Sequence, residues 1–340
     1  MKSEGQNHYI LSLFFILAVW MSKVMSRTLQ EASLSEKYEQ WIARYGKVYM
    51  DAEEKRKRFL IFKNSLEFIE SFNAAGNKPY QLSINQFADQ TNEEFKAAHN
   101  GYKRSQGLRT MSETSFSYKN VTHVPASVDW RKKGAVTPVK AQGLCGGWAF
   151  SSVAATEGIH QITTGKLVSL SVQEVIDCDK VIGEGCVGGS IEDGFEFIIK
   201  NGGITSEANY PYKGVEATCE TKKEASHVAK IKGYENVPAN NEEALLKAVA
   251  GQPVSAAIDA GESSFQFYSS GVFTGDCGTE LDLGVAVVGY GLADNGIEYW
   301  LLKNSWGTEW GEQGYMRMKR NITAKEGLCG IAMDASYPTD

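Results

Sequence analysis

The chain has 340 residues, with 35 lysines and arginines against 41 aspartates and glutamates, and a formal net charge of −6 at pH 7. This balance excludes the broad basic surface by which proteins bind nucleic acid, so we expect no nucleic acid among its partners. Hydrophobic residues make up 42% of the chain and charged residues 22%. Such a composition is typical of a globular protein with a substantial core.

An apolar run, ILSLFFILAVW, occupies residues 10–20 and follows Lys2. It is shorter than a membrane-spanning helix needs, and it fits the apolar core of a secretory signal. We expect cleavage after the small residue Ser26, so residues 1–26 are predicted to be a signal peptide. No second run of this length follows. The processed chain is therefore expected in the secretory pathway, extracellular or vacuolar/lysosomal, with no membrane attachment.

Residues 27–123 contain no cysteine and show helical periodicity. Ser33 followed by Glu36 predicts a helix start of the capping-box type. Thr91 followed by Glu94 predicts a second. Between them, six residues recur at steps of three or four, which places them on one face of a helix. They are Glu54, Arg58, Phe62, Ser65, Ile69 and Asn73.

A linker and a change of pattern follow. Residues 101–123 lack periodicity and are predicted to be an exposed linker. Beyond them, GWAFSSVAATEGIHQI, LSVQEVIDC and IEDGFEFIIKNGG are helix-like. From about residue 230, short strand-like runs predominate: PVSAAIDA, GVAVVGYG, IEYWLLKNSW and GYMRMKR. One short helix, NEEALLKAVA, precedes them, and Asn295-Gly296 predicts a tight turn. A helical half before a strand half predicts an α+β fold.

All six cysteines lie in the last two-thirds of the chain. In an oxidising compartment an even number predicts three disulfide bonds, although the sequence alone leaves the pairing open. No CxxC or HxxxH pair accompanies them, so we expect no metal and no cofactor. Two sequons, NVT at Asn120 and NIT at Asn321, predict glycosylation.

Several blocks together resemble plant precursors, of the senescence type, in the papain family of cysteine proteases. The helix face described above resembles the E-R-F-N-I-N motif of the family's prosegment, with Ser65 in place of asparagine. SINQFAD resembles the G-x-N-x-F-x-D motif, with Ser83 in place of glycine. Further on, VDWRKKGAVTPVK, GCVGG, KNSWGTEWGEQGYMRM and CGIAMDASYP are similar to family blocks. The resemblance runs from Glu31 to the C-terminus.

The resemblance implies a papain-like two-domain fold, with a helical left domain and an antiparallel β-barrel right domain, preceded by a helical inhibitory prosegment. We therefore expect the prosegment at 27–123 and the mature domain at 124–340. The resemblance also implies three disulfide bonds that use all six cysteines: Cys145 with Cys186, Cys178 with Cys219, and Cys277 with Cys329.

An active family member has one further cysteine, whose thiolate attacks the peptide carbonyl while a histidine transfers protons. Here the family pattern Q-G-x-C-G-S-C-W-A-F-S is one residue shorter, and Gly147 stands before Trp148 in the nucleophile's place. In LDLGVA, Leu283 takes the place of the histidine. The oxyanion glutamine and the imidazole-orienting asparagine are kept as Gln142 and Asn304. We expect the shortened loop to displace Gln142 from the helix end.

From these two replacements we predict that the chain is not an enzyme but a non-cleaving monomer that binds peptides, protease inhibitors or prosegments. Two alternatives stay open. One is an active cysteine-type endopeptidase, with Cys145 as the first residue to test; the other is a prosegment that inhibits related proteases. Asp334 either favours basic or polar side chains in a substrate subsite or is a solvated loop carboxylate. The subsite that the resemblance implies comprises Ser190, Ile191, Ala257, Val285 and Asp334.

Overall fold

The computed structural model describes residues 31–99, 101–103, 116–179 and 185–340. The described chain forms two compact units, which meet in the sequence at Phe68 and Ile69. The signal peptide predicted at residues 1–26 lies outside the described residues. Within the described ranges, no helix combines the length and the apolar composition that crossing a membrane requires.

The first unit is helical. Residues 31–45 form one helix, and α2 (Ala52–Ala75) begins in this unit. Trp41 of the first helix and Phe62 of α2 are both buried, with their ring centroids 5.3 Å apart. Ser33 lies inside the first helix, because the helical backbone is already present at residue 31. The helix start predicted at Ser33 is therefore wrong.

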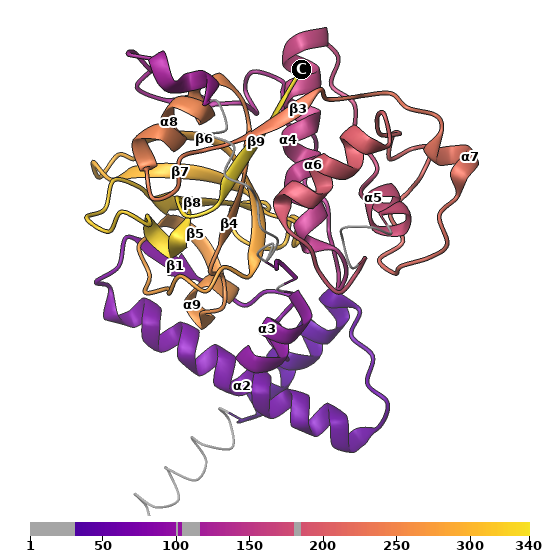
Figure 1. The fold of residues 1–340 in the computed structure, drawn as a ribbon. Helices are drawn as coiled ribbons and strands as arrows, with labels where there is room; N and C mark the ends of the chain where they lie inside the picture. Colours follow the sequence, from indigo (N-terminus) through magenta and orange to yellow (C-terminus); the bar gives the residue numbers. More distant parts are fainter. Residues whose placement is uncertain (1–30, 100, 104–115, 180–184) are drawn as a thin grey trace, which may run out of the picture. The chain divides into compact units, whose positions relative to one another are not determined.

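In the second unit, three helices gather on one side (Figure 1): α4 (Gly147–Thr164), α5 (Val172–Cys178) and α6 (Ile191–Lys200). Small residues let them approach closely. A Cβ atom on Gly194 of α6 would lie 2.1 Å from the hydroxyl oxygen of Ser152 in α4, so only glycine fits there. The three helices predicted in this part of the sequence are confirmed.

Strands and α8 (Glu242–Gly251) make up the other side of this unit (Figure 1). The described strands run in the order β1-β5-β8-β7-β6-β4-β9-β3, with β2 paired to β6. Their pairs are antiparallel except for β5 and β8, which run parallel. The α+β prediction is confirmed. The strands are β1 (Tyr80–Leu82), β2 (Val128–Asp129), β3 (Gly233–Asn236), β4 (Val254–Ile258), β5 (Tyr268–Phe273), β6 (Leu283–Leu292), β7 (Glu298–Lys303), β8 (Tyr315–Lys319) and β9 (Ala335–Thr339).

The turn between β6 and β7 is the predicted one. Gly296 has φ +78°, a conformation that costs glycine little, and its N–H donates to the Ala293 carbonyl at 2.8 Å. The side-chain oxygen of Asn295 accepts from the Ile297 N–H at 3.2 Å. These bonds close the hairpin and fix the alignment of the two strands.

A strand from the N-terminal part of the chain joins this sheet. β1 pairs antiparallel with β5, so that Tyr80 lies opposite Gly271. Asn73, near the end of α2, holds β1 in place. Its amide donates to the Leu82 carbonyl at 2.8 Å, and its oxygen accepts from the Leu82 N–H at 3.0 Å. This explains what the last residue of the predicted helix face does.

α3 (Asn92–His99) begins at the predicted capping box. Glu94 N–H donates to Thr91 Oγ1 at 3.2 Å, and Thr91 N–H donates to the Glu94 carboxylate at 3.0 Å. Phe95 of α3 is fully buried, with its ring centroid 5.0 Å from that of Trp306. α3 is thereby fixed against the segment that follows β7.

The stretch predicted to be an exposed linker contains structure in its described parts. Tyr102 is buried and forms a parallel bridge with Gly189. Ser117–Asn120 forms the 3₁₀ helix η1. The prediction of an exposed linker is therefore wrong for Tyr102, whereas Ser117, Lys119 and Asn120 are exposed as predicted although they form a short helix.

Candidate functional site

The candidate site lies where the loop from Gln142 enters α4. Gly146 precedes the helix with φ +70°, and the helix begins at Gly147. Trp148 is fully buried, and its indole N–H donates to the Gly185 carbonyl at 3.0 Å. The position before Trp148 thus carries a backbone amide at a helix N-terminus but no nucleophilic side chain.

The side chain of Gln142 lies directly beside Gly147. A Cβ atom on Gly147 would be 3.0 Å from both Nε2 and Oε1 of Gln142. Gln142 Oε1 accepts from the Ser305 hydroxyl at 2.6 Å, and Nε2 donates to the His99 carbonyl at 3.0 Å. The expected displacement of Gln142 is therefore wrong, because the shortened loop keeps its amide donor at the helix end. A donor in this place can stabilise an oxyanion.

His99, the last residue of α3, lies against the same loop. Its Nδ1 is 3.0 Å from the Gly143 carbonyl, which only accepts hydrogen bonds, so Nδ1 carries a proton. Its Nε2 is 3.3 Å from Gln90 Oε1. The ring is buried, with its centroid 4.6 Å from that of Phe87. Sequence reasoning missed this contact because the fold alone brings residues so far apart together.

Every cysteine of the chain is in a disulfide bond, and no free thiol is present in this oxidised form. One group of potential metal-ligating residues occurs among the described side chains: Cys178, Cys219 and Glu224. Its two sulfurs are joined to each other and offer no thiolate to a metal. The pairs are those that the resemblance implies: Cys145–Cys186, Cys178–Cys219 and Cys277–Cys329.

Leu283 and Asn304 lie toward the same end of the β6–β7 strand pair. Leu283 begins β6 and is fully buried. In the β6–β7 pair, Ala286 lies opposite Lys303, so Asn304 follows β7 at the end where β6 begins. The Asn304 side-chain oxygen accepts from the Ser305 N–H at 2.7 Å, and among the described residues its Nδ2 has no hydrogen-bond partner. Leucine offers no ring nitrogen for this amide to orient.

The side chain of Tyr102 is buried in an apolar cluster with Ile191 and Ala257, which we call the Tyr102 pocket. Ile191 and Ala257 are buried around it, and Leu281 packs against them. The Tyr102 hydroxyl donates a hydrogen bond to Asp334. Two of the predicted subsite residues therefore line an apolar pocket, and the Asp334 carboxylate accepts a hydrogen bond at its end. Asp334 is thus bonded to a tyrosine of the same chain, and its role in a substrate subsite stays a prediction.

The backbone of residues 101–103 runs past the start of α4 like an added strand. Lys103 N–H donates to the Gly189 carbonyl at 3.0 Å, and Gly189 N–H donates to the Gly101 carbonyl at 3.3 Å. A Cβ atom on Gly101 would lie 4.0 Å from the Gly147 nitrogen. A Cβ atom on Gly189 would lie 2.8 Å from the Trp148 ring. A Cβ atom on Gly188 would lie 2.7 Å from the Gly101 carbonyl oxygen, so a glycine at this position allows the close approach of the two backbones.

Two other predicted subsite residues have different positions. Ser190 is fully buried, and its hydroxyl caps α6 by accepting from the Asp193 N–H at 3.2 Å. Val285 pairs with Ala256, whereas Ala257 pairs with Gly284. Successive strand residues point to opposite faces, so Val285 faces away from the pocket that Ala257 lines. Sequence reasoning missed Leu281, which packs against the cluster of Tyr102, Ile191 and Ala257.

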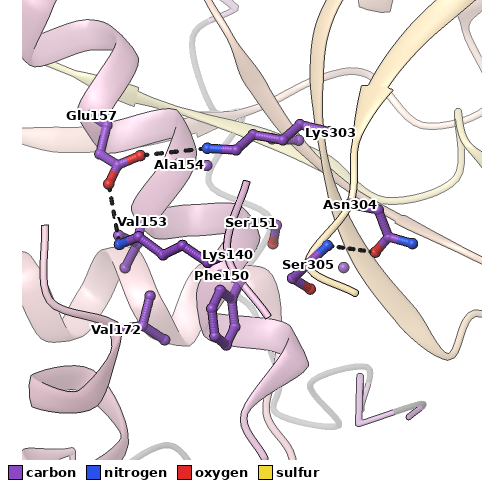
Figure 2. A pocket seen from close by; sticks show the side chains of 12 residues that line it. Lys140, Phe150, Ser151, Val153, Ala154, Glu157, Val172, Lys303, Asn304 and Ser305 are labelled. Carbon is purple, nitrogen blue, oxygen red and sulfur yellow. Dashed lines mark hydrogen bonds and ion pairs between the residues drawn. The ribbon is translucent and has the colours of Figure 1, made fainter. Parts of the chain in front are cut away.

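A small cavity of about 20 Å³, with room for about one water molecule, lies behind the site between α4 and the β6–β7 pair (Figure 2). Glu157 is buried beside it, 3.4 Å from Lys140 Nζ and 3.9 Å from Lys303 Nζ. Thr137 connects the charges, since its hydroxyl donates to Glu157 at 2.5 Å and accepts from Lys303 at 2.9 Å. Burial lowers the pKa of Lys303, and the carboxylate of Glu157 opposes this effect.

The two predicted glycosylation residues are exposed. Asn120 ends η1. Asn321 has φ +59°, and its Nδ2 donates to a Glu298 carboxylate oxygen at 3.0 Å. A glycan on Asn321 would leave Nδ2 one N–H, which could keep that bond. For Asn120 the structure records no side-chain hydrogen bond among the described residues.

Two family models match the chain: papain family cysteine protease over residues 124–339, and cathepsin propeptide inhibitor domain (I29) over residues 38–95. The chain is 56% identical over 316 residues to senescence-specific cysteine protease SAG39 of Oryza sativa subsp. indica, covering 91% of each protein. It is 52% identical over 315 residues to KDEL-tailed cysteine endopeptidase CEP2 of Arabidopsis thaliana, covering 91% of this chain and 86% of the relative. The solved proform of the Amb a 11 cysteine protease, a major ragweed pollen allergen, superposes with TM-score 0.84 at 46% identity, covering 91% of this chain and 95% of that one.

These findings contradict the prediction that the chain is not an enzyme. Relatives that are 50–56% identical over 91–97% of the chain are named as cysteine proteases, and the matching model is that of an enzyme family. That prediction rested on the side chains at two positions, Gly147 and Leu283. The papain-like fold with a helical prosegment is confirmed. The chain belongs to the papain family of cysteine proteases, with a prosegment of the cathepsin propeptide inhibitor type.

Proposed function

We propose that the chain acts in proteolysis as the precursor of a papain-type cysteine endopeptidase whose cleft takes extended peptide segments. One observation carries the proposal: residues 101–103 pair with Gly189 while Tyr102 fills the pocket that ends at Asp334. Main-chain bonds of this kind supply affinity for an extended peptide, and side-chain pockets supply selectivity. The relatives named as proteases support the proteolytic role.

Hydrolysis by a thiol mechanism places a specific demand on this chain. The cysteine nearest in sequence to the start of α4 is Cys145, which is bonded to Cys186. A thiolate can form there only after that bond is reduced. Gln142 would supply a side-chain donor to the oxyanion. Leu283 cannot accept a proton, so another group would have to act as the base. Endopeptidase activity of this chain is therefore expected to require a reductant.

The test is hydrolysis of fluorogenic peptides by the mature form, released by an added protease that is then removed. Turnover that needs a reductant and disappears in Cys145→Ser supports the endopeptidase proposal. A matched control, Cys277→Ser with Cys329→Ser, removes a disulfide bond remote in sequence from the loop and should keep the turnover. Absence of turnover in reductant, while a papain-type enzyme in the same assay is active, overturns the proposal of hydrolysis. Peptide binding is then measured separately by calorimetry.

The pocket suggests the class of side chain that a peptide places there. Ile191 and Ala257 can contact the apolar part of an aromatic or aliphatic side chain. The ionised carboxylate of Asp334 has no proton to donate, so it serves only as a hydrogen-bond acceptor. We propose that peptides with tyrosine, lysine or arginine at this position bind better than those with phenylalanine or glutamate. The proposed preference includes the polar or basic side chains expected from the sequence, and it adds tyrosine.

We further propose that the chain follows the secretory route to an extracellular or vacuolar compartment as a monomer. The apolar segment at residues 10–20, the three disulfide bonds and the relative named as KDEL-tailed support this route, since KDEL is a retention signal of the endoplasmic reticulum. Its partners would be peptides, protease inhibitors or prosegments. Glycans on Asn120 and Asn321 belong to the same proposal, and glycosidase treatment followed by mass measurement tests them.

A second candidate function is inhibition of related proteases by the prosegment. The match to a propeptide inhibitor model and the position of Tyr102 in the pocket favour it. A chain of residues 27–123 should inhibit an active papain-type enzyme, and Tyr102→Ala should weaken that inhibition. Equal inhibition by residues 27–123 with and without Tyr102→Ala would contradict the role assigned to Tyr102.

A further inference from the structure

Two asparagines among the described residues are followed directly by glycine: Asn201 by Gly202, and Asn295 by Gly296. An asparagine in such a pair can lose its side-chain amide, because glycine has no side chain to shield its backbone nitrogen, which attacks the asparagine Cγ. Asparagine is accordingly one of the thermolabile residues of proteins. The two pairs consist of the same residues, so we compare how the fold holds each of them.

The Asn295 pair lies at the exposed tip of the hairpin between β6 and β7. Asn295 Oδ1 accepts from the Ile297 N–H at 3.2 Å. A bond to the residue two positions on curls the side chain over the intervening peptide, which brings Cγ toward the Gly296 nitrogen. A Cβ atom on Gly296 would have nothing within 4 Å, so the space around that residue is open. The reacting groups are therefore near each other and unobstructed.

One backbone bond opposes the attack. The Gly296 N–H donates to the Ala293 carbonyl at 2.8 Å, and this bond must open before the nitrogen can react. A single bond in an exposed turn opens far more readily than one in the core. Gly202 has a similar bond, from its N–H to the Ile199 carbonyl at 3.1 Å. The backbone bonds therefore do not distinguish the two pairs.

The side chains do distinguish them. Asn201 Nδ2 donates to the Glu174 carboxylate at 3.0 Å and to the Gly203 carbonyl at 3.1 Å. Glu174 is fully buried, so loss of Nδ2 would remove a donor from a buried carboxylate, which is unfavourable. For Asn295 Nδ2 the structure records no hydrogen bond among the described residues. The nitrogen that leaves in the reaction is thus fixed in Asn201 but not in Asn295.

We propose that Asn295 is a site of spontaneous deamidation and that the fold protects Asn201 from the same reaction. The Gly296 nitrogen loses its proton to a solvent base and forms a bond to Asn295 Cγ. The bond from Cγ to Nδ2 breaks, and Nδ2 leaves as ammonia. Water then opens the cyclic succinimide at either of its carbonyls, which gives aspartate or isoaspartate. The net reaction consumes a water molecule and releases ammonia.

The two products affect the hairpin differently. Aspartate at position 295 keeps an oxygen for the Ile297 N–H and adds a negative charge beside Asp294. Isoaspartate instead adds a methylene group to the main chain. It lengthens a turn that is closed by the bond from the Ala293 N–H to the Ile297 carbonyl, at 2.9 Å. The isoaspartate form should therefore weaken the pairing at this end of β6 and β7.

Ageing of the full-length precursor at pH 8 tests the proposal. Samples are digested with chymotrypsin, and the change of side-chain NH₂ to OH is followed by mass in the peptides that carry the two asparagines. In the folded chain Asn295 should react at least about tenfold faster than Asn201, because Asn201 reacts only after local opening. In urea the two rates should converge. Equal rates in the folded chain, or the same difference in urea, would overturn the proposal.

The matched variant is Asn295→Gln, whose longer side chain would have to close a larger ring. It should lose the mass change at this position and leave the rate at Asn201 unaltered. Enzymatic methylation of isoaspartate should label the aged wild type more than the aged variant, and equal labelling would contradict the assignment. Ageing at pH 5 should be slower, because the Gly296 nitrogen must lose a proton; faster reaction at pH 5 would exclude this route. None of these outcomes depends on whether the chain hydrolyses peptides.

Discussion

The hydroxyl of Tyr102 donates a hydrogen bond to Asp334, which joins the N-terminal part of the chain to the pocket of the protease region. The ring of Tyr102 is buried with Ile191 and Ala257 while its backbone pairs with Gly189. One residue thus uses both kinds of contact that an extended ligand would use. It also shows which chemistry the pocket accepts.

Replacing Asp334 should change the selectivity of this pocket. Asp334→Ala removes the charged acceptor, and a hydrogen bond to a charged group contributes about 1.5–3 kcal/mol. In the mature form, the ratio of the affinities for a tyrosine peptide and its phenylalanine counterpart should therefore fall about tenfold or more. Calorimetric binding of the two peptides measures the ratio. Ile191→Val serves as a control that should weaken both peptides alike, and an unchanged ratio in Asp334→Ala would refute the role of the carboxylate.

The loop before α4 predicts how a thiol can be introduced. Gly147→Cys alone places a Cβ atom 3.0 Å from both polar atoms of the Gln142 amide, which Ser305 and His99 hold in place. Inserting a serine before the new cysteine lengthens the loop to the family pattern. Both variants also carry Leu283→His. The variant with the inserted serine should hydrolyse peptides at least about a hundredfold faster than the one without it, since a misplaced catalytic group typically lowers the rate by that factor.

Fluorogenic hydrolysis and thiol titration together measure this difference. The same insertion with serine in place of the new cysteine is the control, and it should lack the added activity. Equal rates with and without the inserted serine would show that the Gln142 side chain moves away from the new cysteine at little cost. Its hydrogen bonds to Ser305 and His99 would then not fix its position.

Residues that act through local pattern could be predicted from the sequence, and residues that act through tertiary contact could not. Thr91 and Glu94 form a capping box three residues apart, and Asn295-Gly296 makes its own turn. Tyr102 and His99 contact residues that lie far away in the chain, and no periodic signal marks either of them. Val285 shows a third case, because a shift of one strand position turned a predicted pocket residue to the opposite face.

Glu174 should make the chain more stable in acid than at neutral pH. It is fully buried in α5, and burial raises the pKa of its carboxyl to about 8 from the ordinary value of 4.5, against the hydrogen bonds from Thr205 and Asn201. Between these values the folded chain keeps a proton that the unfolded chain loses. Stability is therefore highest below about pH 4.5 and falls as the pH rises toward 8, by about 1.4 kcal/mol per pH unit.

Urea unfolding at pH 5 and pH 7 checks this slope. Glu174→Gln mimics the protonated carboxyl and should remove the decline in the free energy of unfolding. The stability of the variant relative to the wild type should therefore increase as the pH rises. Glu243→Gln, an exposed carboxylate on α8, controls for the loss of a charge and should show no such gain. A wild type and a Glu174→Gln variant with parallel pH profiles would mean that Glu174 is ionised in the folded chain.

The buried charges behind the site should be strongly coupled. Glu157 is 1% exposed between Lys140 and Lys303, and Thr137 connects it to Lys303. Removing one member of a buried pair leaves an uncompensated charge, which typically costs about 3–5 kcal/mol. We expect a loss of this size in the free energy of unfolding for Glu157→Gln, and a double variant with Lys303→Met should lose less than the sum of the two single changes.

The matched surface change is Lys200→Met, which breaks the Lys200–Glu196 pair on α6 and should cost at most about 1 kcal/mol. Additive losses at Glu157 and Lys303 would show that Lys140 alone compensates the carboxylate, and that Lys303 is held by Thr137 and by packing.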